Sequence, residues 1–459
     1  MLGVIIEAGP QNWQILQQRD GYAEMELAGC YVRRTEGTAE QVYGRVVRED
    51  TGDPVLSWQP ADMLPDNHWR LRLKQVPVGG LYRIETCLQE DASVRMEWCT
   101  RGDMVHHLGV GDLFVLAGQS NSAGYGKDIV SDPPELGVHF LRSSDRWDLA
   151  AHPFNDSTGT CHPVNQEAAN PGHCPYLAFG KAMHKALGYP IGLIPCALGG
   201  SPLSAWNPEE EGSLYNNMLH CVRSQGGAVR AVAWYQGCAD TAGGPPTEQY
   251  LMRFAAMVRH LREDLRAPDL PVFTFQIARF LVKPVSQTEE RAWDLIREQQ
   301  RQAARQIPGV YVLPTLDGMV SDMIHNSAPF NLVLGERLAK QMLSKLYGRP
   351  SLCDAPDLQA LCWDGPQTLR LTFAPVADYL YCFEMEPEQL PFWLEDSQGR
   401  LQITSYTVGR DQITLQLDRP ARDSVKIVHH RGQNPLEHCI VDFANHYPTL
   451  AFSQTLAVE

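Results

Sequence analysis

The alternation of hydrophobic and polar residues divides the chain into three regions. In residues 1–108, the segment 69–73 alternates with a period of two, and the segment 41–47 is rich in strand formers. Turn signals separate these segments, and no helical period stands out. This pattern predicts an all-β domain, which we interpret as a β-sandwich.

Between residues 109 and 348 the pattern changes to alternating strands and helices. Apolar runs predict five strands, at residues 113–117, 191–197, 229–235, 271–278 and 310–313. Helical spacing of apolar residues predicts helices at residues 247–266, 293–306 and 332–346. Such alternation is typical of a parallel sheet with helices on both faces. Residues 126–175 are rich in turn formers, and we expect them to form long loops over the sheet edge.

From residue 349 to residue 459 the period of two returns. It is seen in the segments 369–373, 401–404, 412–417 and 425–428. The predicted fold class is therefore α/β, with a three-layer α/β/α domain of about five parallel strands between two all-β sandwich domains. The predicted domain boundaries are 1–108, 109–348 and 349–459.

Composition and charge narrow the class of protein. The 459 residues are 44% hydrophobic and carry a formal net charge of -15, without a basic run. An acidic chain of this kind is not expected to bind nucleic acid or an anionic membrane. No stretch approaches the ~18 apolar residues of a membrane span, and residues 1–21 lack the pattern of a signal peptide. The twelve scattered cysteines are then expected to be reduced thiols in a cytoplasmic protein.

One serine follows the first strand of the central region. Gly118 ends the apolar run, and Gln119, Ser120 and Asn121 come next. A serine at the carboxyl end of a buried strand lies where α/β sheets place their chemistry. We interpret Ser120 as a nucleophile; the alternative is a polar turn that simply ends a strand.

An activated serine needs a base, a group that orients the base, and donors for the oxyanion. His325 is the candidate base, with Asp322 three residues before it as the orienting carboxylate. The glycines at 199 and 200 follow a second strand, and Gln236 follows a third. Each of these features alone could be an ordinary turn or strand end. Together they lie at the sheet edge where sites are built.

These segments resemble the ordered blocks of the SGNH hydrolases. Residues 118–121, 199–206, 234–237 and 322–325 are similar to the blocks of the sialate O-acetylesterase and acetylxylan esterase group. The segments 110–114, 297–300, 335–339 and 431–435 also resemble parts of that group. The resembling blocks are scattered over residues 110–450, and the set in order is specific although each block alone is not.

The resemblance implies a serine esterase that removes O-acetyl groups from sialic acid or from acetylated oligosaccharides. Its implied triad is Ser120, Asp322 and His325. Its implied oxyanion donors are the backbone N–H groups of Ser120 and Gly200 and the side chain of Gln236. The implied substrate-binding residues are Gln119, Asn121, Ser201 and Trp206. This chemistry needs no metal and no organic cofactor, and the sequence does not indicate an oligomeric state.

The sequence departs from the family pattern after Gln236 and Gly237. Cys238 stands where relatives usually have a glutamate, so we expect the surroundings of the site to lack a carboxylate. Cys238 could itself be a nucleophile, but no base lies near it in sequence. Residues 161–162 and 173–174 are two Cys/His pairs whose spacing does not match a common zinc site.

Two further functions stay open at this point. The first is a non-catalytic carbohydrate-binding protein, in which Trp147 and Trp206 would stack on a sugar. The second is an acyltransferase that uses the same serine and passes the acyl group to a sugar instead of to water.

Overall fold

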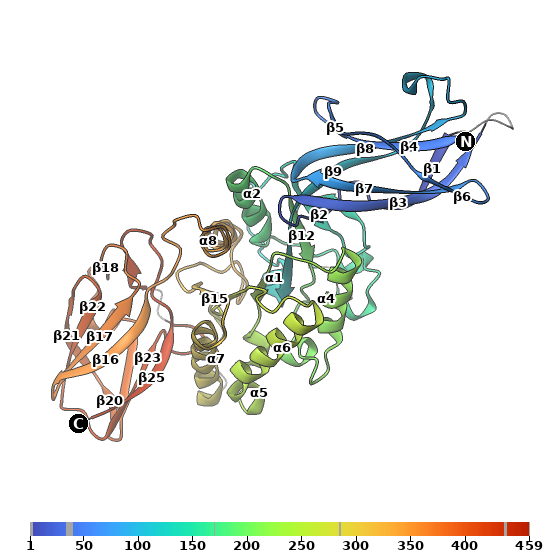
Figure 1. The fold of residues 1–459 in the computed structure, drawn as a ribbon. Coiled ribbons are helices and arrows are strands. Elements are labelled where there is room, and N and C mark those ends of the chain that lie inside the picture. The colour runs from blue at the N-terminus through green and yellow to red at the C-terminus, as the bar shows by residue number, and fades with distance from the viewer. Residues whose placement is uncertain (1–2, 34–39, 169, 284–285, 436–437, 459) are drawn as a thin grey trace.

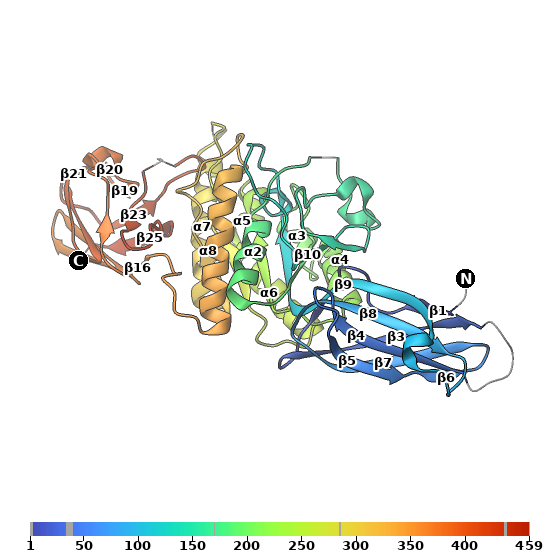
Figure 2. The ribbon, with the colours of Figure 1, turned by 90° about the horizontal axis from the view of Figure 1, so that it is seen from above.

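The computed structural model describes residues 3–33, 40–168, 170–283, 286–435 and 438–458. Its central part lies between an N-terminal and a C-terminal group of β-strands, which sit at opposite ends of the molecule (Figures 1 and 2). The central part carries the sheet from which the candidate active site is built.

The central sheet has seven strands, and all but one run parallel. Their order is β11 (Trp147–Leu149), β10 (Val138–Leu141), β12 (Ile191–Pro195), β9 (Thr100–Gly118), β13 (Ala231–Tyr235), β14 (Val272–Phe275) and β15 (Val310–Leu313). Strand β11 is antiparallel to β10. The five predicted strands are present, but β10 and β11 lie in the region expected to be loops. They were missed because they are short and because β10 carries a buried polar residue, His139, inside its apolar run.

Alternate residues of β9 face opposite sides of the sheet. Leu113 and Val115 belong to a buried cluster with α3 (Leu203–Trp206), α4 (Ser213–Ser224), α6 (Tyr250–Asp264) and α7 (Gln287–Gln306). Phe114 and Leu116 belong to a second cluster with α2 (Tyr176–Leu187) and α8 (Ala328–Tyr347). Helices therefore cover both faces, which explains why the strands are apolar without alternation.

The helix boundaries differ from the expected ones. The helix expected at 247–266 is two helices, α5 (Pro245–Glu248) and α6. Helix α7 begins at Gln287, where the Ser286 side chain accepts a hydrogen bond from the N–H of Glu289. The hydrophobic period missed this start because the first turn is polar, whereas the capping residues would have indicated it. Helices α2 and α4 were not predicted.

The N-terminal strands form two sheets around one core. The first sheet has the order β1 (Gly3–Ala8), β3 (Tyr22–Val32), β7 (His68–Pro77) and β6 (Asp62–Leu64). The second joins β5 (Pro54–Pro60), β4 (Gln41–Arg48), β8 (Gly79–Gln89) and β9, with β2 (Ile15–Gln17) paired to β9. Strand β9 continues from this sheet into the central one, so it crosses the predicted boundary between residues 108 and 109.

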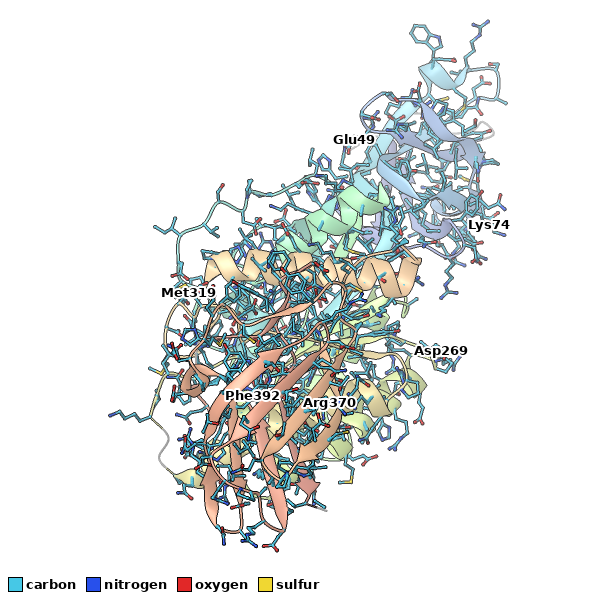
Figure 3. All side chains as sticks on the ribbon, turned by 90° about the vertical axis from the view of Figure 1, so that its left-hand side faces the viewer. Glu49, Lys74, Asp269, Met319, Arg370 and Phe392 are labelled. Atoms are coloured by element: carbon cyan, nitrogen blue, oxygen red, sulfur yellow. The ribbon has the colours of Figure 1, made fainter. Side chains whose placement is uncertain are left out.

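The C-terminal strands also form two main sheets around one core. One has the order β16 (Asp357–Gly365), β17 (Thr368–Ala374), β22 (Gln412–Leu417) and β21 (Ile403–Val408). The other has the order β20 (Gly399–Leu401), β19 (Phe392–Asp396), β23 (Ser424–His429) and β25 (Phe452–Ala457). Strands β18 (Leu380–Tyr381) and β24 (Val441–Asp442) pair separately. Figure 3 shows Arg370 and Phe392 on these strands, far from Glu49 and Lys74 of the N-terminal part. None of the helices described is long and apolar enough to cross a membrane.

Candidate active site

The candidate nucleophile stands directly after the central strand of the sheet. β9 ends at Gly118, Gln119 is the N-cap residue, and Ser120 opens the single-turn helix α1 (Ser120–Ala123). Gly118 has a φ of 124°, and a Cβ atom there would lie 2.2 Å from the carbonyl oxygen of Tyr235. Only glycine fits this close approach, so the sharp turn that presents Ser120 depends on it.

The structure brings Ser120, His325 and Asp322 into one hydrogen-bonded relay. Ser120 Oγ lies 2.9 Å from His325 Nε2, and His325 Nδ1 lies 2.7 Å from Asp322 Oδ2. Ser120 is 6% exposed, and the side chain of His325 is 15% exposed. The three side chains thus have the separations that proton transfer from a serine requires, close to the molecular surface.

The loop that carries His325 is closed by its own carboxylate. Asp322 Oδ1 accepts hydrogen bonds from the N–H groups of Ile324 and His325, each at 2.8 Å. Burial alone would raise the pKa of Asp322. The hydrogen bonds from these N–H groups and from the His325 ring outweigh burial, so the pKa lies below its usual value. The carboxylate is therefore ionised at neutral pH and can stabilise a protonated His325.

Asn121 joins the serine turn to the histidine loop. Its Oδ1 atom accepts a hydrogen bond from the N–H of Asn326 at 2.9 Å, and its Nδ2 atom donates to the carbonyl of Ile324 at 3.3 Å. Asn121 is only 4% exposed. Since both ends of its amide are used, the side chain fixes His325 relative to Ser120 and is not free to bind substrate as predicted.

Two backbone N–H groups at the site, those of Ser120 and Gly200, are candidate oxyanion donors. Neither the N–H of Ser120 nor that of Gly200 donates to another residue in the part of the chain that the structure describes. Gly200 has a φ of +65°, and a Cβ built there would meet no atom within 4 Å, so this turn faces open space. Unpaired N–H groups beside a nucleophile are the usual donors of an oxyanion hole.

Gln236 does not offer the donor that the sequence predicted. Its side chain is fully buried, and its Nε2 atom donates to the carbonyl of Ser201 at 3.2 Å and to Asp240 Oδ2 at 2.5 Å. Both N–H bonds are thus occupied within the protein. Asp240 also accepts the N–H of Leu203 and pairs with Arg253, so a buried carboxylate lies in this region although Cys238 replaces the glutamate.

In Gln119, unlike in Gln236, the amide oxygen rather than the amide nitrogen is bonded to the protein. Its Oε1 atom accepts the N–H groups of Gly237 at 3.1 Å and Ala239 at 3.3 Å. These bonds fix the orientation of the amide, while its Nε2 atom donates to no other described residue. Gln119 therefore carries a free donor next to the nucleophile, and it holds the turn after β13 in place.

Ser201 and Trp206 do not line the site as predicted. The Trp206 side chain is fully buried, and its indole N–H donates to Ser201 Oγ at 2.9 Å. Ser201 Oγ lies 2.9 Å from the carbonyl of Leu198, to which it donates. The pair stabilises the turn around Gly200. Trp147 is also buried, with 4% exposure, so neither tryptophan can stack on an external sugar.

Two residues near the site were missed by the sequence argument. The Tyr125 ring lies 5.0 Å from the His325 ring, measured between centroids. Glu167 Oε2 accepts the N–H of Gly199 at 3.0 Å, beside the open turn at Gly200. Neither residue stands in a block that resembles the family, and Glu167 comes from a long irregular segment. No short motif could have indicated them.

Cys238 is unsuited to nucleophilic chemistry. Burial raises the pKa of its thiol to about 12, so it is protonated at neutral pH.

Comparison with known proteins identifies the family. Residues 110–344, which are more than half of the chain, match the family described as carbohydrate esterase, sialic acid-specific acetylesterase. The chain belongs to this family of carbohydrate esterases. The match confirms the resemblance, and it runs from the second half of β9 through most of helix α8.

Several relatives of this carbohydrate esterase are known. A probable carbohydrate esterase of Arabidopsis thaliana is 35% identical over 191 residues, which are 36% of this chain and 68% of that protein. Sialate O-acetylesterase of Homo sapiens is 22% identical over 310 residues, which are 58% of this chain and 56% of that protein. The crystal structure of a carbohydrate acetylesterase from Xanthomonas citri has the same fold, with a TM-score of 0.69 and 21% identity over 97% of this chain and 98% of that one.

Proposed function

We propose that this carbohydrate esterase hydrolyses O-acetyl esters of sugars through an acetyl-enzyme on Ser120. The observation that carries the proposal is the Ser120–His325–Asp322 relay, with separations of 2.9 and 2.7 Å, beside two unpaired N–H groups. A nucleophile, a base, an orienting carboxylate and oxyanion donors are the parts that acyl transfer needs.

The reaction follows from these positions. His325 Nε2 takes the proton of Ser120 as the hydroxyl oxygen bonds to the acetyl carbon. The tetrahedral oxyanion accepts hydrogen bonds from the N–H groups of Ser120 and Gly200. His325 then gives its proton to the sugar oxygen as the ester bond breaks. Water attacks the acetyl-serine with His325 again as the base, and acetate leaves.

Gln119 is the third oxyanion donor in this proposal, in place of Gln236. Its free Nε2 atom and its position next to Ser120 support this role, whereas the amide nitrogen of Gln236 is bonded to Ser201 and Asp240. We assign Gln236 to a supporting role beneath the turn. Asn121, Ser201 and Trp206 likewise support the site rather than contact the sugar.

The substrate class is an acetylated sialic acid or an acetylated oligosaccharide. The names of the sialate O-acetylesterase and carbohydrate acetylesterase relatives support both choices. We propose the domains 1–108, 109–348 and 349–459, with an SGNH-type three-layer domain between two sandwiches and with strand β9 shared across the first boundary. We propose a cytoplasmic location, which the twelve scattered cysteines support.

Acetate release tests the function. Purified wild type and Ser120→Ala would be incubated with O-acetylated sialic acid, acetylated xylo-oligosaccharides and acetylated manno-oligosaccharides. We expect release from at least one substrate by the wild type only, together with labelling of Ser120 by a fluorophosphonate. Sugar binding without labelling or release would favour a binding protein, and transfer of acetyl to a second sugar would indicate an acyltransferase.

A further inference from the structure

A second group of reactive side chains lies outside the candidate active site. It consists of Asp145 in the turn between β10 and β11, Cys161 and His162 in the following segment, and His220 on helix α4. His162 Nε2 lies 2.9 Å from Asp145 Oδ1, and Cys161 Sγ lies 3.4 Å from Asp145 Oδ2. One ligand atom from each of Asp145, His162 and His220 falls within 4.8 Å of the others. Residues from three separate segments thus converge on one point.

These distances suit a tetrahedral metal ion. Bonds of roughly 2.0 to 2.3 Å from zinc to nitrogen, oxygen and sulfur place neighbouring ligand atoms about 3.3 to 3.8 Å apart. The separations of 2.9 and 3.4 Å in this group lie close to that range. The exposed Cys161 thiol contacts Asp145 but is not one of the three converging residues, so its side chain must rotate to supply the fourth donor. Two imidazoles, one carboxylate and one thiolate would then form a donor set that zinc prefers over calcium or magnesium.

The surroundings leave the donors available. No lysine or arginine in the described part of the chain forms an ion pair with Asp145, which lies against the ring of His162. His220 is exposed and makes no hydrogen bond to another described residue, so its ring can turn toward an ion. His162 is 8% exposed, and a bound ion would occupy a partly shielded position.

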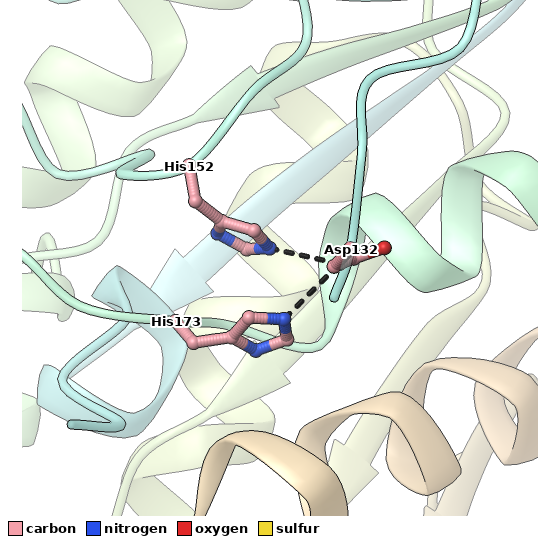
Figure 4. A group of neighbouring side chains, drawn as sticks. All are labelled: Asp132, His152 and His173. Carbon is pink, nitrogen blue, oxygen red and sulfur yellow. Dashed lines mark hydrogen bonds and ion pairs between the residues drawn. The ribbon is translucent and has the colours of Figure 1, made fainter. Parts of the chain in front are cut away.

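A different group, Asp132 with His152 and His173, provides a comparison (Figure 4). The two Nε2 atoms lie 3.0 and 3.1 Å from Asp132 Oδ2, but the ammonium group of Lys181 is bound to the same carboxylate. A dication there would be repelled by this ammonium group.

The two histidine rings of that group add a second argument. The Nδ1 atoms of His152 and His173 are buried and without a partner. Metal ligation through Nε2 would move the ring proton to Nδ1, where it would be buried without an acceptor. This group therefore fits a hydrogen-bonded ion-pair network without metal, in which both rings donate from Nε2 to Asp132.

We propose that Asp145, Cys161, His162 and His220 bind one Zn²⁺ ion. On binding, the S–H bond of Cys161 breaks, the sulfur lone pair bonds to zinc, and one proton is released to the solvent. The ion would join the β10–β11 turn and the segment before Glu167 to helix α4. We assign the site a structural role, since none of its residues is hydrogen-bonded to Ser120, His325 or Asp322 in the described part of the chain.

Burial and the neighbouring Asp145 raise the pKa of the Cys161 thiol in the metal-free protein. Zinc must displace this proton when it binds the sulfur.

The proposal is tested with the full-length protein. Protein freed of metal with a chelator would be titrated with Zn²⁺ against a chromophoric zinc indicator, and separately with Co²⁺. We expect one equivalent of zinc and, with cobalt, a near-ultraviolet charge-transfer band from the Cys161 thiolate. Cys161→Ser and His220→Ala, both at exposed positions, should each weaken zinc binding at least about 10-fold, and Cys161→Ser should abolish the band.

Two control variants separate the outcomes. Cys362→Ser removes an exposed cysteine on β16 and should leave zinc binding unchanged. Asp132→Asn disrupts the other group of histidines and should also leave it unchanged. The proposal is overturned if no equivalent of zinc binds, if binding survives both Cys161→Ser and His220→Ala, or if Asp132→Asn alone removes it.

Discussion

The two oxygens of Asp322 have different partners, and in the proposed mechanism only one of them acts in catalysis. Oδ1 closes the loop through two backbone N–H groups, whereas Oδ2 faces the ring of His325. A residue with one acceptor oxygen could keep the loop but not the ring orientation. This division allows the catalytic contribution of the carboxylate to be measured separately from its contribution to folding.

We therefore expect Asp322→Asn to fold normally and to lose activity. The asparagine Oδ1 can still accept the two N–H groups, but its amide N–H₂ would face His325 Nδ1 and favour the wrong tautomer. We predict a decrease in kcat of roughly 100- to 10,000-fold on p-nitrophenyl acetate. An unchanged urea midpoint would confirm folding, and an unchanged kcat would show that Asp322 does not orient the base.

Gln119 is expected to contribute through its amide nitrogen. Gln119→Glu keeps an oxygen that can accept the N–H groups of Gly237 and Ala239 but removes the donor. Loss of one oxyanion donor costs roughly 100- to 1,000-fold in kcat, with little change in KM. Gln119→Met, which lacks both functions, should in addition lower the free energy of unfolding. If Gln119→Glu has the kcat of the wild type, Gln119 is not an oxyanion donor.

At the scale of elements, helix α7 connects the active-site domain to the C-terminal strands. Its Arg297 is 1% exposed and donates to four carbonyl groups, those of Ile277, Ala278, His430 and Gly432. Two of these lie after β14 and two lie after β23. One guanidinium group therefore supplies hydrogen bonds to buried carbonyl groups in loops of both domains.

We expect removal of this guanidinium group to destabilise the fold strongly. Arg297→Met would leave the four carbonyl groups buried without a donor, and we predict a loss of more than about 3 kcal/mol in the free energy of unfolding. Arg291→Met at an exposed position of the same helix serves as the control. Urea unfolding of both variants checks the prediction, and similar midpoints for the two would contradict it.

Helix α7 also shows what the sequence could and could not reveal. The segment 297–300 resembled the family, and apolar periodicity located the helix, but neither indicated why polar residues were there. Gln300 accepts a hydrogen bond from the N–H of Ile277 and donates one to the carbonyl of Gln236. Glu298 accepts a hydrogen bond from the N–H of Ser453. These partners are 23 to 155 residues away in sequence, and local patterns carry no information about them.

Because local patterns do not reveal distant partners, the sequence located some residues of the candidate site correctly and misjudged others. Ser120, His325 and Asp322 were found because each lies in a short block after a strand or in a tight loop. The predicted roles of Gln236 and Trp206 assumed that a residue in a functional block faces the substrate. Burial decides this orientation, and burial depends on helices α3 and α6, which come from elsewhere in the chain.

At the scale of the whole molecule, Asp294 makes the folding stability depend on pH. The Asp294 carboxyl lies, like Arg297, between helix α7 and the segment after β23. It accepts a hydrogen bond from the N–H of Gly432 at 2.5 Å, and Asp294 is 5% exposed. Burial raises its pKa to about 6 from the usual 3.8. Between these values the folded protein keeps a proton that the unfolded chain has lost, so the free energy of unfolding falls as the pH rises from about 4 to about 6.

Asp294→Asn should remove this dependence. The asparagine Oδ1 can still accept the N–H of Gly432, and it carries no charge. Relative to wild type, we expect the variant to become more stable as the pH is raised from 4 to 7, by up to about 3 kcal/mol. Urea unfolding at both pH values measures the difference, with Asp269→Asn at an exposed position as the control (Figure 3). A difference that does not change with pH would contradict the assignment.

Strand β9 pairs with β8 over residues 100–110 and with β12 and β13 over residues 112–118. Both ends of the strand are therefore held by partners that belong to different sheets. An added residue would move the serine by about 3.3 Å or exchange the two faces of the strand. Evolution of this segment is thus confined to side-chain changes at constant length, even though the N-terminal strands lie far from the chemistry.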